Sequence, residues 1–258
     1  YDEEPRMYTK ITQCSIEPSR KIQSSIKREK MIGHVGQMGG EYPLSPSQRE
    51  SISCFQEIED GEVLAVNGPP GTGKTTLLQS IVADMYVKTA LKREKAPIIV
   101  ATSTNNQAVT NIIESFGKIN SIGIKNLEKR WVTGVHSFAV YFPSKGKEAE
   151  AKRNNYQYTN VAGEAFVEEV ESEDNRKNSQ QVFDEAFIEY FGYKWNLLSE
   201  AVERIHAELL RVDRQRIQCI ESMVELVKIL GKKGIVEYLE DLSTQIEHNE
   251  KEINICRE

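Results

Sequence analysis

One short segment constrains this chain more than any other feature. Residues Gly68–Thr75 read Gly-Pro-Pro-Gly-Thr-Gly-Lys-Thr, which fits the pattern GxxxxGK[ST] at every position. The glycines let backbone N–H groups turn around a phosphate, and Lys74 adds a positive charge for the β- and γ-phosphates of a nucleotide. The Thr75 hydroxyl completes the coordination shell of a Mg²⁺ ion. The segment therefore predicts a nucleotide-binding loop.

The residues around this loop alternate between two hydrophobic patterns. Apolar runs at 63–66 and 97–101 are typical of buried strands, and residues 131–133 resemble the start of a third. Between these runs, apolar residues at helical spacing predict two helices, around residues 77–85 and 109–116. A short helix capped at Ser45 or Ser47 precedes the first run. Strand and helix in alternation predict an α/β fold with a parallel sheet.

The second half of the chain has a different character. Residues 143–180 are polar, and we expect loose or short helices there. From residue 195 onward an apolar stripe runs in alternating steps of four and three, with one break at Arg216. The turn at 231–234 separates it from a weaker stripe. This pattern predicts a long antiparallel helical hairpin, in which each apolar face packs on the other helix.

The segments on either side of the loop resemble the superfamily 1 helicases, in the group that includes the nonsense-mediated-decay helicase. Gln48, in the sequence Ser-Gln, lies ahead of the loop where that family carries a glutamine that reads adenine. Residues 102–111 read Thr-Ser-Thr-Asn-Asn-Gln-Ala-Val-Thr-Asn, which matches the family's motif Ia. The resemblance covers roughly residues 43–142.

The resemblance implies a RecA-like ATP-binding domain and a set of site residues. Lys74 and Thr75 would be catalytic, and Thr75 would hold Mg²⁺. The residues implied to bind ATP are Gln48, Gly68, Pro69, Pro70, Gly71, Thr72, Gly73, Lys74, Thr75 and Thr76. Those implied to hold the nucleic-acid backbone are Thr102, Ser103, Thr104, Asn105 and Asn106. The implied cofactors are ATP and Mg²⁺, and the implied partner is single-stranded DNA or RNA.

The family's acidic motif, an apolar strand that ends in Asp-Glu, has no clear counterpart. Asp-Glu pairs occur at Asp2-Glu3 and Asp184-Glu185. The aromatic residues that follow Asp184-Glu185 sit at helical spacing, so we interpret this pair as part of an amphipathic helix. The chain therefore looks truncated before the acidic motif, and we expect this chain alone to hydrolyse ATP negligibly.

Composition narrows the class of protein further. Lys and Arg number 33 against 39 Asp and Glu, a net charge of -6, which argues against a surface that is basic overall. The chain contains no apolar run long enough to span a membrane. Its four cysteines are dispersed, with no zinc-binding spacing, which favours a reducing, cytoplasmic location.

We divide the chain into a polar lead-in (1–42), a partial RecA-like core (43–142), a polar insertion with short helices (143–194) and a hairpin arm (195–258). The predicted function is the ATP-binding part of a superfamily 1 helicase, which couples ATP hydrolysis to movement on single-stranded nucleic acid. One alternative is an AAA-type remodelling ATPase. Another is a nucleotide-switched interaction module that contacts a protein partner through the arm.

Overall fold

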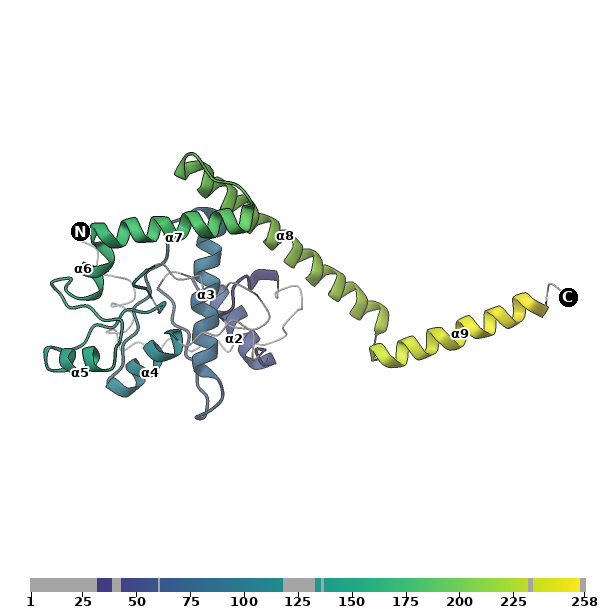
Figure 1. The fold of residues 1–258 in the computed structure, drawn as a ribbon. Coiled ribbons are helices and arrows are strands. Elements are labelled where there is room, and N and C mark those ends of the chain that lie inside the picture. The colour runs from purple at the N-terminus through teal and green to yellow at the C-terminus, as the bar shows by residue number, and fades with distance from the viewer. Residues whose placement is uncertain are drawn as a thin grey trace.

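A computed structural model describes residues 32–38, 43–59, 61–117, 133–135, 137–231 and 234–255. Most of the lead-in at 1–42 and the start of the expected third strand at 131–132 lie outside the described residues. The described part forms a helical body from which a long arm projects (Figure 1).

Two helices form the first part of the body. Helix α2 (Pro46–Gln56) begins at a capping box, in which the Ser45 hydroxyl accepts from the Gln48 backbone and the Gln48 side chain accepts from the Ser45 backbone. Helix α3 (Lys74–Lys92) begins after the predicted loop. Leu44, Ile52 and Leu77 are buried together between the two helices. The helices expected on either side of the loop are thus confirmed.

A second small core surrounds helix α4 (Asn106–Gly117). The segment 137–165 folds against α4 and contains the turn η3 (Lys145–Lys147) and helix α5 (Glu148–Arg153). Ile113, Tyr141 and Ala151 are buried there, and the Tyr156 ring meets the Tyr141 ring edge-on. Apolar contacts between distant parts of the chain therefore hold α4 in place.

Helices α6 (Phe166–Glu171), α7 (Glu173–Phe191) and α8 (Leu198–Leu230) follow. Phe187 is buried among Phe183, Phe191 and Tyr193 where the chain turns from α7 into α8. Across this turn the Tyr190 hydroxyl donates to Glu208. Hydrogen bonds from Arg211, supported by Tyr190, lower the pKa of Glu208 to about 2.

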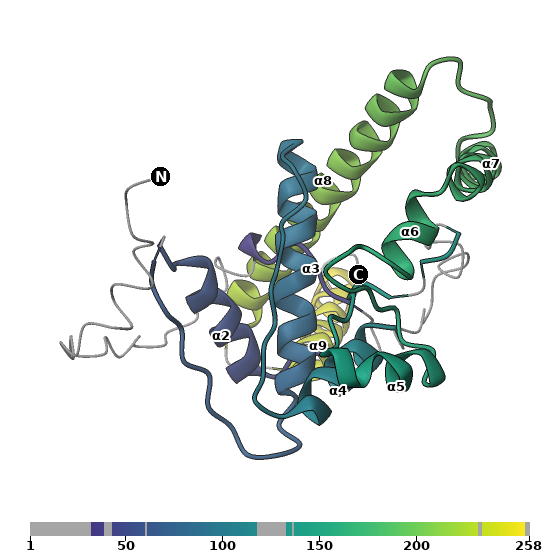
Figure 2. The same ribbon diagram turned by 90° about the vertical axis from the view of Figure 1, so that its left-hand side faces the viewer.

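The first half of α8 is anchored to the body beside the carboxyl end of α3 (Figures 1 and 2). Arg93 pairs with Glu203, and a ring nitrogen of His206 lies 3.0 Å from the carbonyl oxygen of Leu91. Further along, Arg216 donates to the carbonyl oxygen of His34 at 3.2 Å. Arg216 breaks the apolar stripe because its position on α8 faces the polar backbone of residues 32–38.

The predicted parallel sheet is not present: the described residues contain helices and two isolated bridges, Tyr141–Tyr158 and Thr159–Ala165. The expected strands at 63–66 and 97–101 have no regular secondary structure and no strand partner in the described part. Val63, Ile98 and Val100 are accordingly 69%, 93% and 80% exposed. An apolar run indicates an extended segment that favours burial, but a strand also needs a neighbour for its backbone hydrogen bonds.

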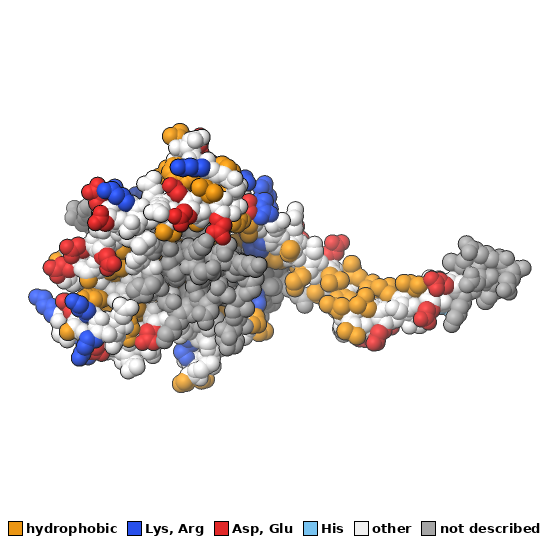
Figure 3. Space-filling view, in the orientation of Figure 1, with side chains coloured by type: hydrophobic (Ala, Val, Ile, Leu, Met, Phe, Trp, Pro, Cys, Tyr) orange, Lys and Arg blue, Asp and Glu red, His pale blue; other side chains and the backbone are white. Residues whose placement is uncertain are grey.

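The predicted antiparallel packing of the arm is also wrong. The two long helices themselves exist, since α9 (Ile235–Ile255) follows α8 after a short connection. However, α9 leads away from α8 instead of back along it (Figure 1). Met223, Ile235 and Leu239 remain 55–61% exposed, and apolar side chains gather visibly along the arm (Figure 3). A stripe predicts which face of a helix is apolar, but it does not determine what covers that face.

None of the described helices combines the length and the apolar character needed to cross a membrane.

Candidate functional site

The glycine-rich loop places two backbone positions in the left-handed region. Gly71 has φ of +80° and Gly73 has φ of +76°, which residues with a side chain rarely adopt. Gly73 is the N-cap of α3, and no side chain caps that end of the helix. The first backbone N–H groups of a helix lack partners within the helix and attract anions. The start of α3 therefore suits a phosphate group.

Lys74 folds back over this loop. Its Nζ donates to the carbonyl oxygens of Gly68 at 2.6 Å and Pro69 at 2.7 Å, and the side chain is exposed. The Thr72 hydroxyl also donates to Pro69, at 2.9 Å. The ammonium group thus lies at the mouth of the loop, held by carbonyl oxygens that a phosphate oxygen could replace as its partner.

Gln48 lies against the same loop. Its Nε2 donates to the carbonyl oxygen of Gly73 at 2.9 Å, while its Oε1 accepts from the backbone of Ser45 at 2.8 Å. The approach is close enough that a Cβ atom on Gly73 would lie 2.4 Å from Nε2. An amide has two donor hydrogens and an acceptor oxygen with two lone pairs, so each end of the Gln48 side chain keeps one site for a ligand.

The other residues of the predicted nucleotide site lie in the loop and in the first turn of α3. Pro70 and Thr75 are exposed, whereas Thr76 is partly covered. An exposed hydroxyl beside an uncapped helix start is a hard oxygen ligand of the kind that Mg²⁺ prefers. The chemistry of this donor set fits a nucleotide phosphate chain with its metal ion.

The predicted nucleic-acid loop leads directly into α4. Thr102, Ser103, Thr104 and Asn105 are exposed, while the side chain of Asn106 lies outside the described residues. The Asn105 side chain accepts from the backbone of Gln107 at 2.9 Å, so it caps the start of α4. The Ser103 hydroxyl accepts from the backbone of Asn105 at 3.1 Å. Exposed hydroxyl groups and a helix start suit contacts to a phosphodiester backbone.

The Asp184-Glu185 pair lies in the interior of α7, as its helical spacing predicts. Glu185 is exposed and accepts from Gln181 within the same helix at 3.0 Å. Asp184 precedes it on the helix, with one carboxylate oxygen buried. This pair therefore does not end a strand beside the glycine-rich loop, which is the arrangement that an acidic ATPase motif requires.

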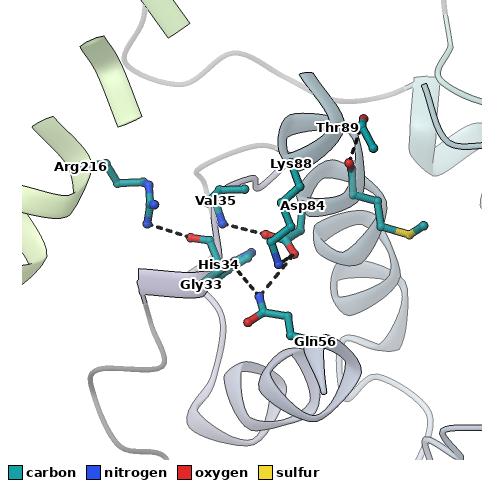
Figure 4. Close-up of polar contacts among 9 residues, drawn as sticks. Gly33, His34, Val35, Gln56, Asp84, Lys88, Thr89 and Arg216 are labelled. Atoms are coloured by element: carbon teal, nitrogen blue, oxygen red, sulfur yellow. Dashed lines mark hydrogen bonds and ion pairs between the residues drawn. The ribbon is translucent and has the colours of Figure 1, made fainter. Parts of the chain in front are cut away.

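A buried carboxylate in α3 was missed by the sequence analysis. Asp84 accepts from the backbone of Val35 at 2.7 Å and from Gln56 at 3.3 Å, and it pairs with Lys88 at 2.7 Å (Figure 4). It is 1% exposed. One signal was available, because Asp84 interrupts an otherwise apolar stretch of α3 and Asp is rarely buried without partners.

Residues 32–38 form a strap that crosses α3, and the hydrogen bond from the Val35 backbone to Asp84 holds it there. The backbone of Gly36 packs so tightly that a Cβ atom there would lie 2.4 Å from the carbonyl oxygen of Ala83. Burial lowers the pKa of His34, although the nearby Asp84 carboxylate acts in the opposite direction. The strap connects α2, α3 and α8, since Gln56 donates to Gly33 and Arg216 donates to His34. The sequence analysis placed these residues in the polar lead-in (1–42) and did not predict their contacts with α2, α3 and α8.

In the described residues, no three His, Cys, Asp or Glu side chains come together in a group that could hold a metal ion.

Comparison with known proteins adds independent information. A family model described as an AAA domain matches residues 43–253, more than half of the chain. DNA-binding protein SMUBP-2 of Mesocricetus auratus is 39% identical over 71 residues, and that of Rattus norvegicus is 38% identical over 71 residues. Each match covers 28% of this chain but 6% of the relative's length. No solved structure matches the chain.

Proposed function

The chain belongs to this AAA domain family, in the SMUBP-2 group of superfamily 1 helicases, and from that membership we propose that it is the ATP-binding part of a helicase motor. In the whole protein, ATP hydrolysis would drive movement along single-stranded DNA or RNA. The observation that supports the proposal best is the uncapped start of α3, preceded by two left-handed glycines and covered by the Lys74 side chain.

Each residue of the loop has a separate task in this proposal. Gly71 and Gly73 turn the backbone so that its N–H groups surround the phosphates. Lys74 exchanges its carbonyl partners for phosphate oxygens and neutralises their charge. The Thr75 hydroxyl orients Mg²⁺, and Gln48 presents its amide to the base. Bound Mg-ATP supplies the phosphoanhydride bond whose hydrolysis releases the free energy for movement.

The nucleic-acid contact is proposed at Thr102–Asn106, where the exposed hydroxyl groups of residues 102–104 and the exposed Asn105 amide lead into α4. Contacts to phosphate and sugar position a strand without reading its sequence, as a moving motor requires. The curated relatives carry the name DNA-binding protein, which supports a nucleic acid as the partner.

The proposal is tested by equilibrium binding. Fluorescent mant-ATP with Mg²⁺ should bind the chain and should be displaced by ATP, and a fluorescein-labelled deoxythymidine or uridine oligonucleotide should bind with an affinity that falls as salt rises. The control is Thr104→Glu, which places a negative charge in the proposed nucleic-acid loop and should weaken oligonucleotide binding while leaving mant-ATP binding unchanged. A chain that binds neither ligand would contradict the proposal.

The exposed apolar face of the arm supports a second candidate function. Its uncovered apolar side chains would suit a nucleotide-switched interaction module, in which ATP biases the position of α8 and α9 toward a protein partner. Such a module, like an AAA-type remodelling ATPase, would bind ATP without responding to single-stranded nucleic acid. ATP binding without any oligonucleotide binding would therefore favour these alternatives.

A further inference from the structure

We propose that Gln79 is a positioning residue that couples the nucleotide loop to the nucleic-acid loop. This inference rests on the proposed function, because it concerns how two proposed sites communicate. The Gln79 side chain extends from α3 and its Nε2 donates to the backbone carbonyl oxygen of Ser115 in α4 at 2.8 Å. One hydrogen bond thus joins the helix that follows the nucleotide loop to the helix that follows the nucleic-acid loop.

On α3, Gln79 occupies the face that also carries the proposed Mg²⁺ ligand. It lies four residues after Thr75, and residues at that spacing sit one above the other on a helix. A shift of the first turn of α3 when Mg-ATP binds would therefore move Gln79 as well. The side chain is half-buried between the two helices, so it has little freedom to absorb that shift.

On α4, the acceptor lies at the end opposite the nucleic-acid loop. Ser115 is in the last turn of α4, where carbonyl oxygens depend on partners outside the helix. At the other end, Asn105 caps the first turn and continues into the proposed nucleic-acid contacts. A helix is a stiff rod, here about 18 Å long. A movement of its last turn therefore reaches the nucleic-acid loop.

The opposite side of α4 is held by the body of the molecule. Tyr156 donates its hydroxyl to Glu114 at 2.8 Å, and Ile113 packs on Tyr141. These contacts fix α4 to the segment 137–165, so α4 and this segment would move together as one unit, with Gln79 as the polar link to α3. Because the acceptor is a backbone oxygen, a substitution of Gln79 removes the link and leaves the α4 side chains intact.

The test measures linkage between the two ligands. Mant-ATP affinity is determined with and without a saturating deoxythymidine oligonucleotide, and oligonucleotide affinity with and without a non-hydrolysable ATP analogue, all with Mg²⁺. In the wild type each ligand should change the affinity of the other by the same factor, about 5-fold or more. In Gln79→Leu that factor should fall to about one, while the affinity for each ligand alone stays within about twofold of the wild type.

Further variants separate coupling from folding. Gln79→Lys keeps a donor with similar reach and should restore most of the coupling factor, whereas Gln79→Glu keeps the shape, loses the donor and should behave like Gln79→Leu. Gln181→Leu removes an exposed glutamine donor on α7 and should keep the wild-type factor.

Wild-type coupling in both Gln79→Leu and Gln79→Glu would overturn the inference, as would loss of binding of either ligand alone in both. If the wild type itself binds neither ligand, the proposed function fails and the inference fails with it. If the wild type binds both ligands and the Gln79 variants keep its coupling, only the inference fails.

Discussion

At the scale of single residues, Lys74 should dominate nucleotide affinity. Its ammonium group already lies at the mouth of the loop, paired with two carbonyl oxygens. Hydrogen bonds to charged groups contribute about 1.5–3 kcal/mol, so Lys74→Ala should weaken mant-ATP binding about tenfold or more. The matched control is Lys92→Ala, which removes an exposed lysine from the far end of α3. Equal affinity of the two variants would contradict the assignment of Lys74.

Gln48 permits a sharper experiment, because its side chain has two roles. It completes the cap of α2 and it contacts the loop at Gly73. Gln48→Ala should narrow the difference between ATP and GTP affinity, measured by competition against mant-ATP. Ser45→Ala removes the capping hydroxyl alone and should cost about 1 kcal/mol of stability while keeping the preference for ATP. If Ser45→Ala loses that preference too, the effect comes from a displaced α2 and not from contact with the base.

The candidate nucleotide-site residues could be predicted from sequence. The GxxxxGK[ST] pattern identifies the loop residues, and the family resemblance identifies Gln48. The structure places Gln48 against Gly73 from a position well upstream in the chain. Asp84 and Gln79 were not predicted, because their partners, Val35 and Ser115, are backbone groups distant in sequence. A side-chain pattern carries no information about such partners.

At the scale of elements, the strap at 32–38 should contribute measurably to stability. Asp84→Ala leaves the backbone N–H of Val35 and the Gln56 amide without their buried acceptor, which costs about 1–3 kcal/mol for each such group. We expect a loss of about 2–4 kcal/mol in the free energy of unfolding, measured in urea.

Two further variants distinguish the parts of this network. Asp84→Asn keeps an acceptor for Val35 and should lose less stability than Asp84→Ala. Lys88→Met removes the partly exposed partner of the ion pair but leaves the hydrogen bonds from Val35 and Gln56, so it should lose less stability than Asp84→Ala. If Asp84→Ala were no more destabilising than Lys88→Met, the strap would contribute nothing through its hydrogen bonds.

The helices were predicted better than the extended segments for a physical reason. A helix satisfies its own backbone hydrogen bonds, so apolar spacing and a cap at Ser45 or a glycine at Gly73 are enough to locate α2 and α3. A strand depends on a neighbour. The segments 63–66 and 97–101 have strand-like composition, but a local pattern cannot show whether a pairing partner lies beside them.

At the scale of the whole molecule, the open arm and a closed antiparallel hairpin differ in how a substitution on α8 should affect the free energy of unfolding. Met223 is 61% exposed on α8, so Met223→Lys should change the free energy of unfolding by less than about 0.5 kcal/mol. For comparison, Ile52→Ala in the buried contact between α2 and α3 should cost about 2–4 kcal/mol. A Met223→Lys variant as unstable as Ile52→Ala would show that α8 and α9 close on each other in solution.

The attachment of α8 near the carboxyl end of α3 leads us to expect lever-like motion of the arm. Arg93, His206 and Arg216 mark where α8 is attached to the helical body. From Arg216 to Leu230 the helix extends about 21 Å further, and α9 lies beyond it. A tilt that barely displaces the fastened half is amplified along this length. A slight rearrangement around Lys74 could thus be converted into a wide excursion of the distal tip.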